Sequence, residues 1–312
     1  MKIYNYEPDI NLIDLDPPIP GFEGLLSCYV VKSNKIALID IGPTSSLPNL
    51  FSALAELRIS PESIDYLLCS HIHLDHTGGI GDSINLFSRA KVIVHEKGIK
   101  HLVDPSYLWQ GSQQILGILA DDYGAPAPVS IDRLISAKDG MIVDLGGIHL
   151  EILLTPGHAS HHISFYEKYT RRLFVGEAAG VNLINSGGLR PAAPTPFDLK
   201  QSLESIDKMI ALNPETIYYA HFGKFENAVY QLNQSKQQLR LWGAVIARHL
   251  NDNCEWQEVF QEIVDSNHSL EKIFTLSEDH RNTLFSAIKS TIFGYHDYLQ
   301  RAGTQVLESL NS

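Results

Sequence analysis

The sequence predicts a mixed α/β fold, and three features of the chain indicate this class. Short apolar segments of strand length recur between residues 10 and 221, a segment with helical spacing separates two of them, and residues 225–312 show helical spacing throughout. Strands that alternate with helices build sheets with helices packed on their faces. The 312 residues, of which 44% are hydrophobic, can form a large core as one domain with an extension.

The strands are expected in two groups, one in each half of the chain. In the first half, apolar segments bounded by turn residues predict strands at residues 10–15, 25–31, 36–40, 64–69 and 91–95. Leucines at helical spacing predict a helix over residues 46–58, and residues 96–125 are expected to be irregular to helical. In the second half, strands are predicted at residues 133–135, 141–145, 148–154, 162–166, 172–175 and 217–220.

A long loop and several helices are expected in the last part of the chain. Residues 180–197 are rich in Gly, Pro and Ala and are predicted to form a loop that could line a substrate site. Asp198 is predicted to cap the helix that follows, whose apolar side carries Leu203 and Ile206. The apolar stripes of the helices in residues 225–312 require a surface to cover.

A cluster of chelating side chains follows the predicted strand at residues 64–69. Positions 71 to 76 read His-Ile-His-Leu-Asp-His, so three histidines and an aspartate lie where a buried strand ends. Alternate residues of an extended segment point to the same side, which places His71 and His73 together, while Asp75 and His76 follow at the turn. Imidazole and carboxylate groups bind zinc, iron and similar ions. Two ligand pairs so close together, and not all aimed the same way, indicate two adjacent metal ions.

Three further segments have the same form, an apolar strand followed by a candidate ligand. His158 follows the apolar residues 152–154, Glu177 follows the strand at residues 172–175, and His221 comes directly after residues 217–220. His161 and His162 also lie near His158 in the sequence. We predict that these two are loop and strand residues rather than ligands, because side chains three and four positions later point elsewhere.

The motif His71-x-His73-x-Asp75-His76, followed in order by His158, Glu177 and His221, resembles the signature of the metallo-β-lactamase fold superfamily over about residues 10–225. Within that superfamily it looks closest to the glyoxalase II-like hydrolases. The resemblance implies a four-layer αβ/βα sandwich. It places a catalytic domain at residues 1–224 and a C-terminal helical extension at residues 225–312, which covers the active site or forms a dimer contact.

The resemblance also implies roles for the candidate ligands. It assigns three of them to each of two divalent transition-metal ions: His71, His73 and His158 to the first ion, and Asp75, His76 and His221 to the second. Glu177 would bridge the two ions, for which zinc is expected and iron or manganese are alternatives. A water between two cations loses its proton near neutral pH, and the hydroxide can attack a carbonyl carbon. Asp75 would be the catalytic residue that holds or relays the proton.

Two further expectations concern the acidic residues Asp40 and Glu177. Asp40 corresponds to a family position behind the metal site that orients a ligand, but it could equally be an ordinary turn residue. Glu177 departs from the family, which usually has Asp there. Because glutamate is one methylene longer, we expect the site of Asp75, His76 and His221 to be the less occupied of the two.

The resemblance favours a hydrolase that cleaves a thioester or ester bond of a small acyl substrate. Three alternatives remain: a lactonase on the same site, an iron-dependent oxidoreductase on the same fold, and a non-catalytic metal-binding regulatory protein. The di-iron oxygen reductases of this fold usually carry Glu where this chain has His73, and they carry a flavin module that the sequence lacks.

Composition limits the partners and the compartment. The formal net charge of −12 makes a nucleic-acid partner unexpected, because such partners are held by cationic contacts to phosphate. No apolar run reaches membrane-spanning length, so no membrane partner is expected. The three cysteines, Cys28, Cys69 and Cys254, are far apart in the sequence and predict reduced thiols in a cytoplasmic protein.

Overall fold

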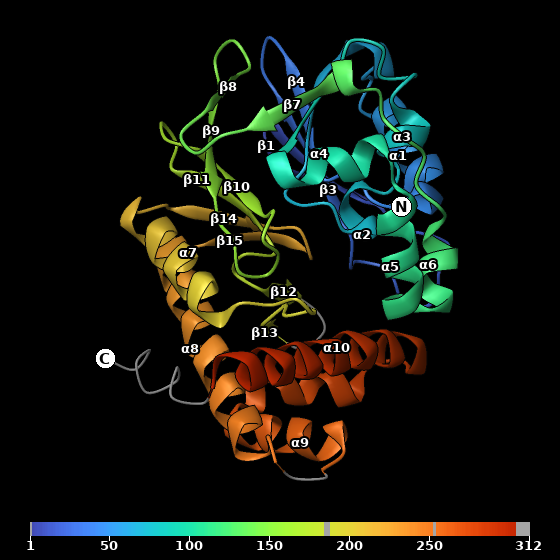
Figure 1. Ribbon diagram of the computed structural model, residues 1–312. Coiled ribbons are helices and arrows are strands. Elements are labelled where there is room, and N and C mark those ends of the chain that lie inside the picture. The colour runs from blue at the N-terminus through green and yellow to red at the C-terminus, as the bar shows by residue number, and fades with distance from the viewer. Residues whose placement is uncertain (1, 184–187, 252–253, 304–312) are drawn as a thin grey trace.

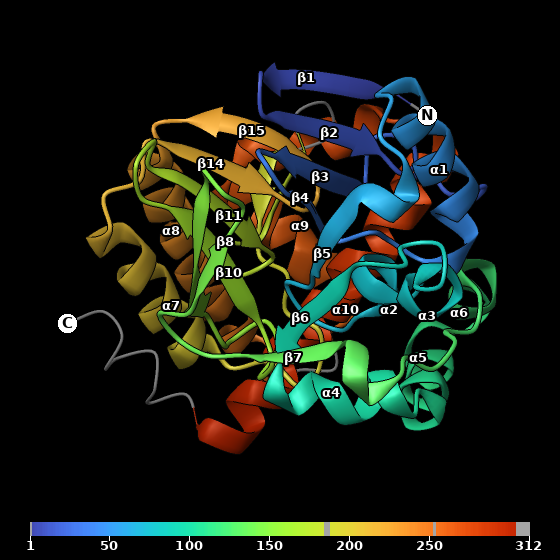
Figure 2. The same ribbon diagram turned by 90° about the horizontal axis from the view of Figure 1, so that it is seen from above.

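The computed structural model of the chain describes residues 2–183, 188–251 and 254–303. Two β-sheets pack face to face, with helices α1 (Leu47–Glu56), α2 (Leu74–Thr77) and α3 (Ile80–Ser83) outside one sheet and α7 (Leu199–Ala211) and α8 (Ala228–Arg248) outside the other (Figures 1 and 2). This arrangement confirms the predicted four-layer αβ/βα sandwich. A single hydrophobic core joins the two sheets and the helices.

The first sheet contains the N-terminal half of the chain. Its seven strands follow chain order: β1 (Ile3–Glu7), β2 (Ile10–Asp14), β3 (Ser27–Lys32), β4 (Ile36–Ile39), β5 (Ile64–Leu68), β6 (Lys91–His95) and β7 (Leu134–Ala137). The pairs from β1 to β4 are antiparallel, and the pairs from β4 to β7 are parallel. Parallel neighbours need crossover connections, which α1 and the helices after β5 and β6 provide.

The second sheet contains the later strands. Its order is β15 (Gly223–Glu226), β14 (Thr216–Tyr219), β11 (Arg172–Gly176), β10 (Ile163–Glu167), β9 (His149–Leu154) and β8 (Ile142–Asp144). Only the pair β11–β14 of this sheet is parallel, and α7 makes the crossover between these two strands. The predicted strands of both halves are therefore present, with ends that differ by a few residues.

Aromatic side chains fill the space between the two sheets. Tyr29 on β3 meets Phe174 on β11 and Tyr218 on β14 edge to face, with ring centroids 5.4 and 5.5 Å apart. Its hydroxyl donates to the carbonyl oxygen of Tyr219 at 2.6 Å, so the buried polar group is satisfied. Aromatic pairs of this kind contribute about 0.5–1.5 kcal/mol each beyond their buried area. These contacts fix the two sheets against each other.

Three elements differ from the prediction. Strand β1 precedes the first strand that was predicted, at residues 10–15. The expected loop at residues 180–197 contains a two-stranded hairpin, β12 (Val181–Leu183) and β13 (Gly188–Arg190), while residues 184–187 lie outside the described part of the chain. Strand β15 enters the segment that was predicted to be entirely helical. All three are strands of three to five residues that pair with the strand next to them in sequence, and so few residues give too little periodicity to be recognised.

The helices differ less from expectation. The segment 96–125 forms α4 (Glu96–Val103), α5 (Ser106–Leu116) and α6 (Ile118–Tyr123). The backbone N–H of Gln201 donates to the Asp198 side chain at 2.9 Å, which confirms Asp198 as the N-cap of α7. Three one-turn 3₁₀ helices complete the connections at Thr44–Ser46, Pro61–Ser63 and Ile131–Arg133.

The last part of the chain forms a layer of helices below the sandwich. After α8 come α9 (Trp256–Ser266), a 3₁₀ segment η4 (His268–Thr275) and the long helix α10 (Glu278–Ala302), which crosses beneath both halves of the fold (Figure 1). The domain boundary at residues 224/225 stays a prediction. Within the described residues, no helix combines the length and the apolar character needed to cross a bilayer.

Candidate metal centre

All seven candidate ligands lie just beyond the ends of strands at one edge of the sandwich. His71 and His73 follow β5, and Asp75 and His76 lie on the short helix α2 that begins directly after them. The remaining three follow three strands of the second sheet: His158 after β9, Glu177 after β11 and His221 after β14.

Backbone hydrogen bonds tie the two sheets together at this edge. The N–H of Ile163 donates to the carbonyl of Ser70 at 2.7 Å, and the N–H of Ser27 donates to the carbonyl of Ala220 at 3.2 Å. Each bond involves the residue immediately before a histidine of the cluster. The strand ends that carry the candidate ligands are thereby brought together across the two halves of the chain.

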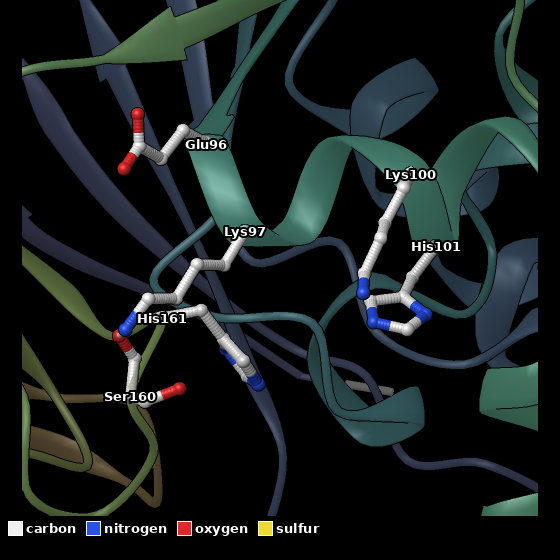
Figure 3. A pocket seen from close by; sticks show the side chains of 6 residues that line it. All are labelled: Glu96, Lys97, Lys100, His101, Ser160 and His161. Carbon is white, nitrogen blue, oxygen red and sulfur yellow. Dashed lines mark hydrogen bonds between the residues drawn. The ribbon is translucent and has the colours of Figure 1, made fainter.

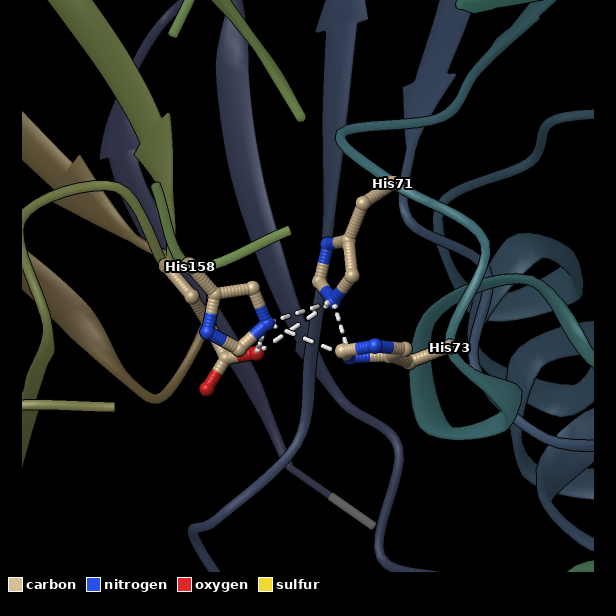
Figure 4. Close-up of side chains that lie close together, drawn as sticks. His71, His73 and His158 are labelled. Atoms are coloured by element: carbon tan, nitrogen blue, oxygen red, sulfur yellow. Dashed lines mark hydrogen bonds and ion pairs between the residues drawn. The ribbon is translucent and has the colours of Figure 1, made fainter. Parts of the chain in front are cut away.

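The first group contains His71, His73, His158 and Glu177, whose potential ligand atoms all lie within 4.8 Å of one another. The Nε2 atom of His71 is 2.9 Å from Nδ1 of His73 and 3.3 Å from Nε2 of His158. Figure 4 shows the three imidazoles converging on one point from three directions. The Glu177 Oε2 atom lies 3.0 Å from Nε2 of His158 and 3.3 Å from Nε2 of His71.

The second group contains Asp75, His76 and His221, again with ligand atoms within 4.8 Å. The Asp75 Oδ2 atom is 3.4 Å from Nε2 of His76 and 3.5 Å from Nε2 of His221. Glu177 reaches this group as well, because Oε2 is 3.4 Å from His76 Nε2 and Oε1 is 3.4 Å from His221 Nε2. Its carboxylate therefore lies between the two groups, despite the extra methylene.

Four of the histidines are held through the nitrogen that faces away from the cluster. Nδ1 of His158 and Nδ1 of His221 donate to the backbone carbonyls of Ala192 and Leu25, each at 3.0 Å. Such contacts fix both the tautomer and the ring direction of a metal-binding histidine. The other two contacts join His71 Nδ1 to Ser70 Oγ at 2.9 Å and His76 Nδ1 to Asp40 Oδ2 at 3.1 Å.

Asp40 organises this outer layer. It is 3% exposed, and its carboxylate accepts hydrogen bonds from the backbone N–H and the hydroxyl of Ser70 at 2.8 and 2.6 Å in addition to its contact with His76. Its backbone has φ of 55°, a conformation that Asp and Asn adopt more readily than most residues. The expected place of Asp40 behind the cluster is thus confirmed, and Ser70 is a supporting residue that the sequence did not reveal.

The donor set fits metal cations. Nitrogen lone pairs and carboxylate oxygens converge at distances of 2.9 to 3.5 Å, and the buried Nε2 of His76 has no hydrogen-bond partner among the described residues. A buried polar atom without a partner is costly, and a cation between these groups would supply one. Five imidazoles and two carboxylates are the ligand types expected for zinc, iron or manganese.

Charge and burial keep most of the ligands in the form that binds metal. Burial and the neighbouring histidines hold the pKa of His71 well below its usual range, and they lower that of His73 to about 4. Burial tends to raise the pKa of Glu177, but His158 and His221 outweigh it and hold this pKa well below its usual range. Neutral imidazoles and ionised carboxylates are the protonation states that metal binding requires.

His76 and His158 behave differently. Burial tends to lower the pKa of His76, but the Asp75 carboxylate, with Asp40 and Glu177, outweighs it and raises this pKa well above its usual range. The pKa of His158 is raised in the same way, because Glu177 outweighs burial. The carboxylates that attract a proton to these two rings would equally attract a metal cation.

His161 and His162 lie outside both groups, as predicted. His162 is fully buried, and its Nε2 accepts the backbone N–H of Glu177 at 3.0 Å while its Nδ1 meets the Thr155 hydroxyl at 2.9 Å. A side chain on Gly176 would place Cβ 2.5 Å from that Nε2 atom, so the residue before Glu177 must be glycine. His162 therefore positions Glu177, a role that the sequence reasoning missed.

A buried arginine is a second feature that the sequence reasoning missed. Arg190 on β13 is only 5% exposed, and its guanidinium interacts electrostatically with the Glu177 carboxylate. Burial lowers its pKa to about 10 while the Glu177 carboxylate opposes this shift, so the group keeps its charge at neutral pH. The signal in the sequence was a single arginine within the Gly-, Pro- and Ala-rich segment predicted to line a substrate site.

A cavity of about 500 Å³ adjoins the first group on the far side of His161 (Figure 3). The ring of His161 is 5.8 Å from that of His73. The remaining lining residues come from α4 and the loop after His158: Glu96, Lys97, Lys100, His101 and Ser160. Two lysines and one glutamate are among these lining residues, so the positive charges outnumber the negative one, which favours an anionic occupant.

Comparisons with known proteins identify the family of the chain. The sequence profile of the family described as Metallo-beta-lactamase superfamily matches residues 22–221. The protein ST1585 of Sulfurisphaera tokodaii, named a metallo-beta-lactamase fold-containing protein, is 30% identical over 207 residues, which cover 65% of this chain and 74% of that protein. A hydroxyacylglutathione hydrolase of Brucella anthropi is 26% identical, with 70% and 74% of the two chains covered.

Solved structures share the fold. The crystal structure of ST1585, from Sulfolobus tokodaii, superimposes with a TM-score of 0.71 over 92% of this chain and 98% of that one, at 23% identity. A structure described as the peroxy diiron species of the chemotaxis sensor ODP matches with a TM-score of 0.52 over 75% and 93% of the two chains, at 17% identity. The long family match and the relative at 30% identity show that the chain belongs to the metallo-beta-lactamase superfamily.

Proposed function

We propose that this protein is a hydrolase that uses two metal ions to cleave an ester or thioester bond. The observation that carries the proposal is the position of Glu177, whose carboxylate lies 3.0 to 3.4 Å from histidine nitrogens of both ligand groups. In this proposal His71, His73 and His158 hold one ion, Asp75, His76 and His221 hold the other, and Glu177 bridges them. Members of the superfamily typically bind metal ions, and we propose zinc, with iron or manganese as alternatives.

The ions would supply a nucleophile from water at neutral pH and would polarise the carbonyl group of the substrate. The residues of the chain have three tasks around them. Asp40, Ser70 and His162 orient the ligands, and Glu177 holds the two groups at a fixed separation. Asp75, the more exposed of the two carboxylates at 21% against 9%, is the proposed catalytic residue because it can exchange a proton with solvent.

Two features favour a substrate that carries a negative group. Arg190 is almost fully buried and keeps its positive charge beside the metal centre, so a substrate carboxylate or phosphate would pair with it favourably. Lys97 and Lys100 add positive charge in the cavity beyond His161. The preference for a thioester or ester rests on the distant similarity to hydroxyacylglutathione hydrolases. We therefore propose a small anionic acyl thioester or ester as the substrate.

The experiment that tests the function uses the full-length protein loaded with zinc. It would be assayed against acyl-thioesters, aryl esters and lactones, with metal content measured on the same samples. We expect hydrolysis that rises in proportion to bound metal and is lost in His71→Ala. A fully loaded protein that hydrolyses no member of this panel would contradict the proposal. If the protein hydrolysed only the lactones of this panel, it would instead be identified as a lactonase.

One alternative has a specific observation in its favour. The fold is shared with a chemotaxis sensor whose structure contains a diiron species, so the same scaffold is compatible with iron. Oxygen uptake by the iron-loaded protein, together with no hydrolysis by the zinc-loaded protein, would favour an iron-dependent oxidoreductase. Metal binding with neither activity would favour a regulatory protein.

Further proposals concern location and assembly. We propose that the protein acts in the cytoplasm, without nucleic-acid or membrane partners. The thiols of Cys28 and Cys69 are buried and form no disulfide, in keeping with this location. The C-terminal helices at residues 225–312 are proposed to cover the cleft or to form a homodimer contact.

A further inference from the structure

One peptide group lies between a candidate metal ligand and the C-terminal helix α10. On one side, the carbonyl oxygen of Ala192 accepts a hydrogen bond from Nδ1 of His158 at 3.0 Å. On the other side, the backbone N–H of Ala193 approaches the hydroxyl oxygen of Thr291 on α10 at 3.4 Å. Ala193 and Thr291 are both buried, at 0% and 5% exposure. The Ala192–Ala193 peptide therefore connects the long helix to His158.

The same peptide segment packs directly on the backbone of α10 at Gly294. A Cβ atom on Gly294 would lie 1.7 Å from the carbonyl oxygen of Ala193, 2.8 Å from its carbonyl carbon and 3.1 Å from the carbonyl carbon of Pro194. The first two distances are shorter than real Cβ contacts, and the atoms concerned belong to the backbone. Glycine is a poor helix former, so its place inside a 25-residue helix is explained by this close approach.

Helix α10 also contacts the loop that supports the second ligand group. A Cβ atom on Gly21 would lie 2.5 Å from the backbone carbonyl carbon of Asp279, in the first turn of α10. Four residues after Gly21, the carbonyl oxygen of Leu25 accepts from Nδ1 of His221 at 3.0 Å. One end of α10 thus packs against the loop of Leu25, and its later part holds the peptide of Ala192.

The carbonyl of Ala192 determines which nitrogen of His158 can bind metal. Because Nδ1 donates its hydrogen to that oxygen, Nε2 carries the lone pair and points toward His71 and His73. Bonds between a metal and its ligands tolerate only about 0.2 Å of displacement. A methyl group on Gly294 cannot be accommodated unless the Ala193 carbonyl and α10 separate by more than this. Because the Ala192–Ala193 peptide directly precedes that carbonyl, the shift would also move the Ala192 oxygen, and the ring of His158 would lose its direction.

We propose that Gly294 and Thr291 of α10 are positioning residues for the first metal site, and that the C-terminal helix is a structural part of the metal centre. The proposal rests on the two-metal centre put forward above. It predicts that a substitution on the packed face of α10, which touches no ligand, weakens metal binding at His71, His73, His158 and Glu177. It does not depend on which substrate the protein cleaves.

The test compares Gly294→Ala with Gly111→Ala in the full-length protein. Both substitutions add one methyl group to a glycine within a helix, but a Cβ on Gly111 of α5 would meet no atom within 4 Å. Zinc affinity would be measured by competition with a chromophoric chelator, and the melting temperature would be measured on the metal-free proteins. Spectra of the cobalt-loaded proteins would report the ligand geometry.

We expect Gly294→Ala to bind one of the two zinc ions about 10–100-fold more weakly and to change the cobalt spectrum, as losses of an outer hydrogen bond to a ligand do. Gly111→Ala should match the parent protein in both measurements. If Gly294→Ala lowers only the melting temperature and leaves zinc affinity unchanged, its role is merely structural and the proposal is wrong.

A second pair of variants keeps the test decisive if Gly294→Ala does not fold. Thr291→Val keeps the shape of the side chain but removes the oxygen that faces Ala193, and Thr291→Ser restores it. We expect weaker zinc binding in the first variant and parental binding in the second; equal affinities in both would overturn the proposal. A parent that binds no zinc would overturn it together with the metal centre. A parent that binds two zinc ions and hydrolyses nothing would contradict only the proposed hydrolase.

Discussion

Replacing Asp40 with asparagine should weaken metal binding without disturbing the backbone. Asparagine has nearly the same shape as aspartate and tolerates the φ of 55° found at this position. If its carbonyl oxygen keeps the hydrogen bond from Ser70 N–H, its amide group takes the place of Oδ2, which lies 3.1 Å from Nδ1 of His76. An amide N–H donor there requires Nδ1 to be the acceptor. The hydrogen of His76 then moves to Nε2, the atom that faces Asp75 and Glu177.

The size of the effect follows from the role of this contact. Loss of an outer partner of a ligating histidine typically costs about 10–100-fold in metal affinity, or about 1.4–2.7 kcal/mol. The folding stability of the metal-free protein should fall by less than this, because the Ser70 hydroxyl can rotate and accept a hydrogen bond from the new amide. We expect the free energy of unfolding of the metal-free Asp40→Asn protein to fall by about 1–2 kcal/mol.

The assay is zinc competition against a chromophoric chelator, with thermal melts of the metal-free proteins alongside. Asp265→Asn is the matched control, since this exposed carboxylate on α9 accepts a hydrogen bond from Gln261 at 2.8 Å and is not among the candidate ligands. The control should bind zinc as the parent does. If Asp40→Asn also binds both ions within twofold of the parent, Asp40 does not set the tautomer of His76 and the reasoning is refuted.

The remaining predictions concern ligands, substrate and pH. His71→Ala and His221→Ala should each remove about one of two equivalents of bound metal, measured by elemental analysis; unchanged content in either would contradict the two-site assignment. Glu177→Asp should raise the metal-to-protein ratio or tighten the weaker site, and equal full occupancy before and after the change would sink this prediction. Arg190→Gln should raise KM for anionic esters by about tenfold or more while neutral esters are little affected; equal changes for both would argue against an anion-binding role. Burial, and then the neighbouring Asp16, raise the pKa of Asp14 to about 6. The folded state therefore holds this proton more tightly than the unfolded state, whose carboxyl has a pKa of about 3.9, so stability is lost as pH rises from about 4 to 6. Asp14→Asn should raise the free energy of unfolding by roughly 2–3 kcal/mol at pH 8 and by little at pH 4, and an equal gain at both pH values in denaturant titrations would refute this.

Sequence patterns captured the parts of the fold whose signal is local. The strands β5, β9, β11 and β14 each carry a short apolar run towards their C-terminal end, so these ends, after which the ligands lie, could be located from the sequence. The strands that were missed are short or lie at an edge. The hairpin β12–β13 has three residues in each strand, and β1 is only partly buried at the edge of its sheet. Such short strands are stabilised mainly by side chains of the elements packed against them, and their own residues give only a weak strand signal.

The sequence by itself determined which chelating side chains are available and that each follows a strand. Tertiary structure decided how they meet, because His71 and His158 are 87 positions apart and come within 3.3 Å only through the register and packing of two sheets. It also decided which ring nitrogens face the centre, since the groups that hold them include the backbone carbonyls of Leu25 and Ala192. Every residue offers the same backbone carbonyl group, whatever its side chain is. No residue type therefore marks these positions in a sequence. Only the folded chain brings helix α10 against the peptide that orients His158.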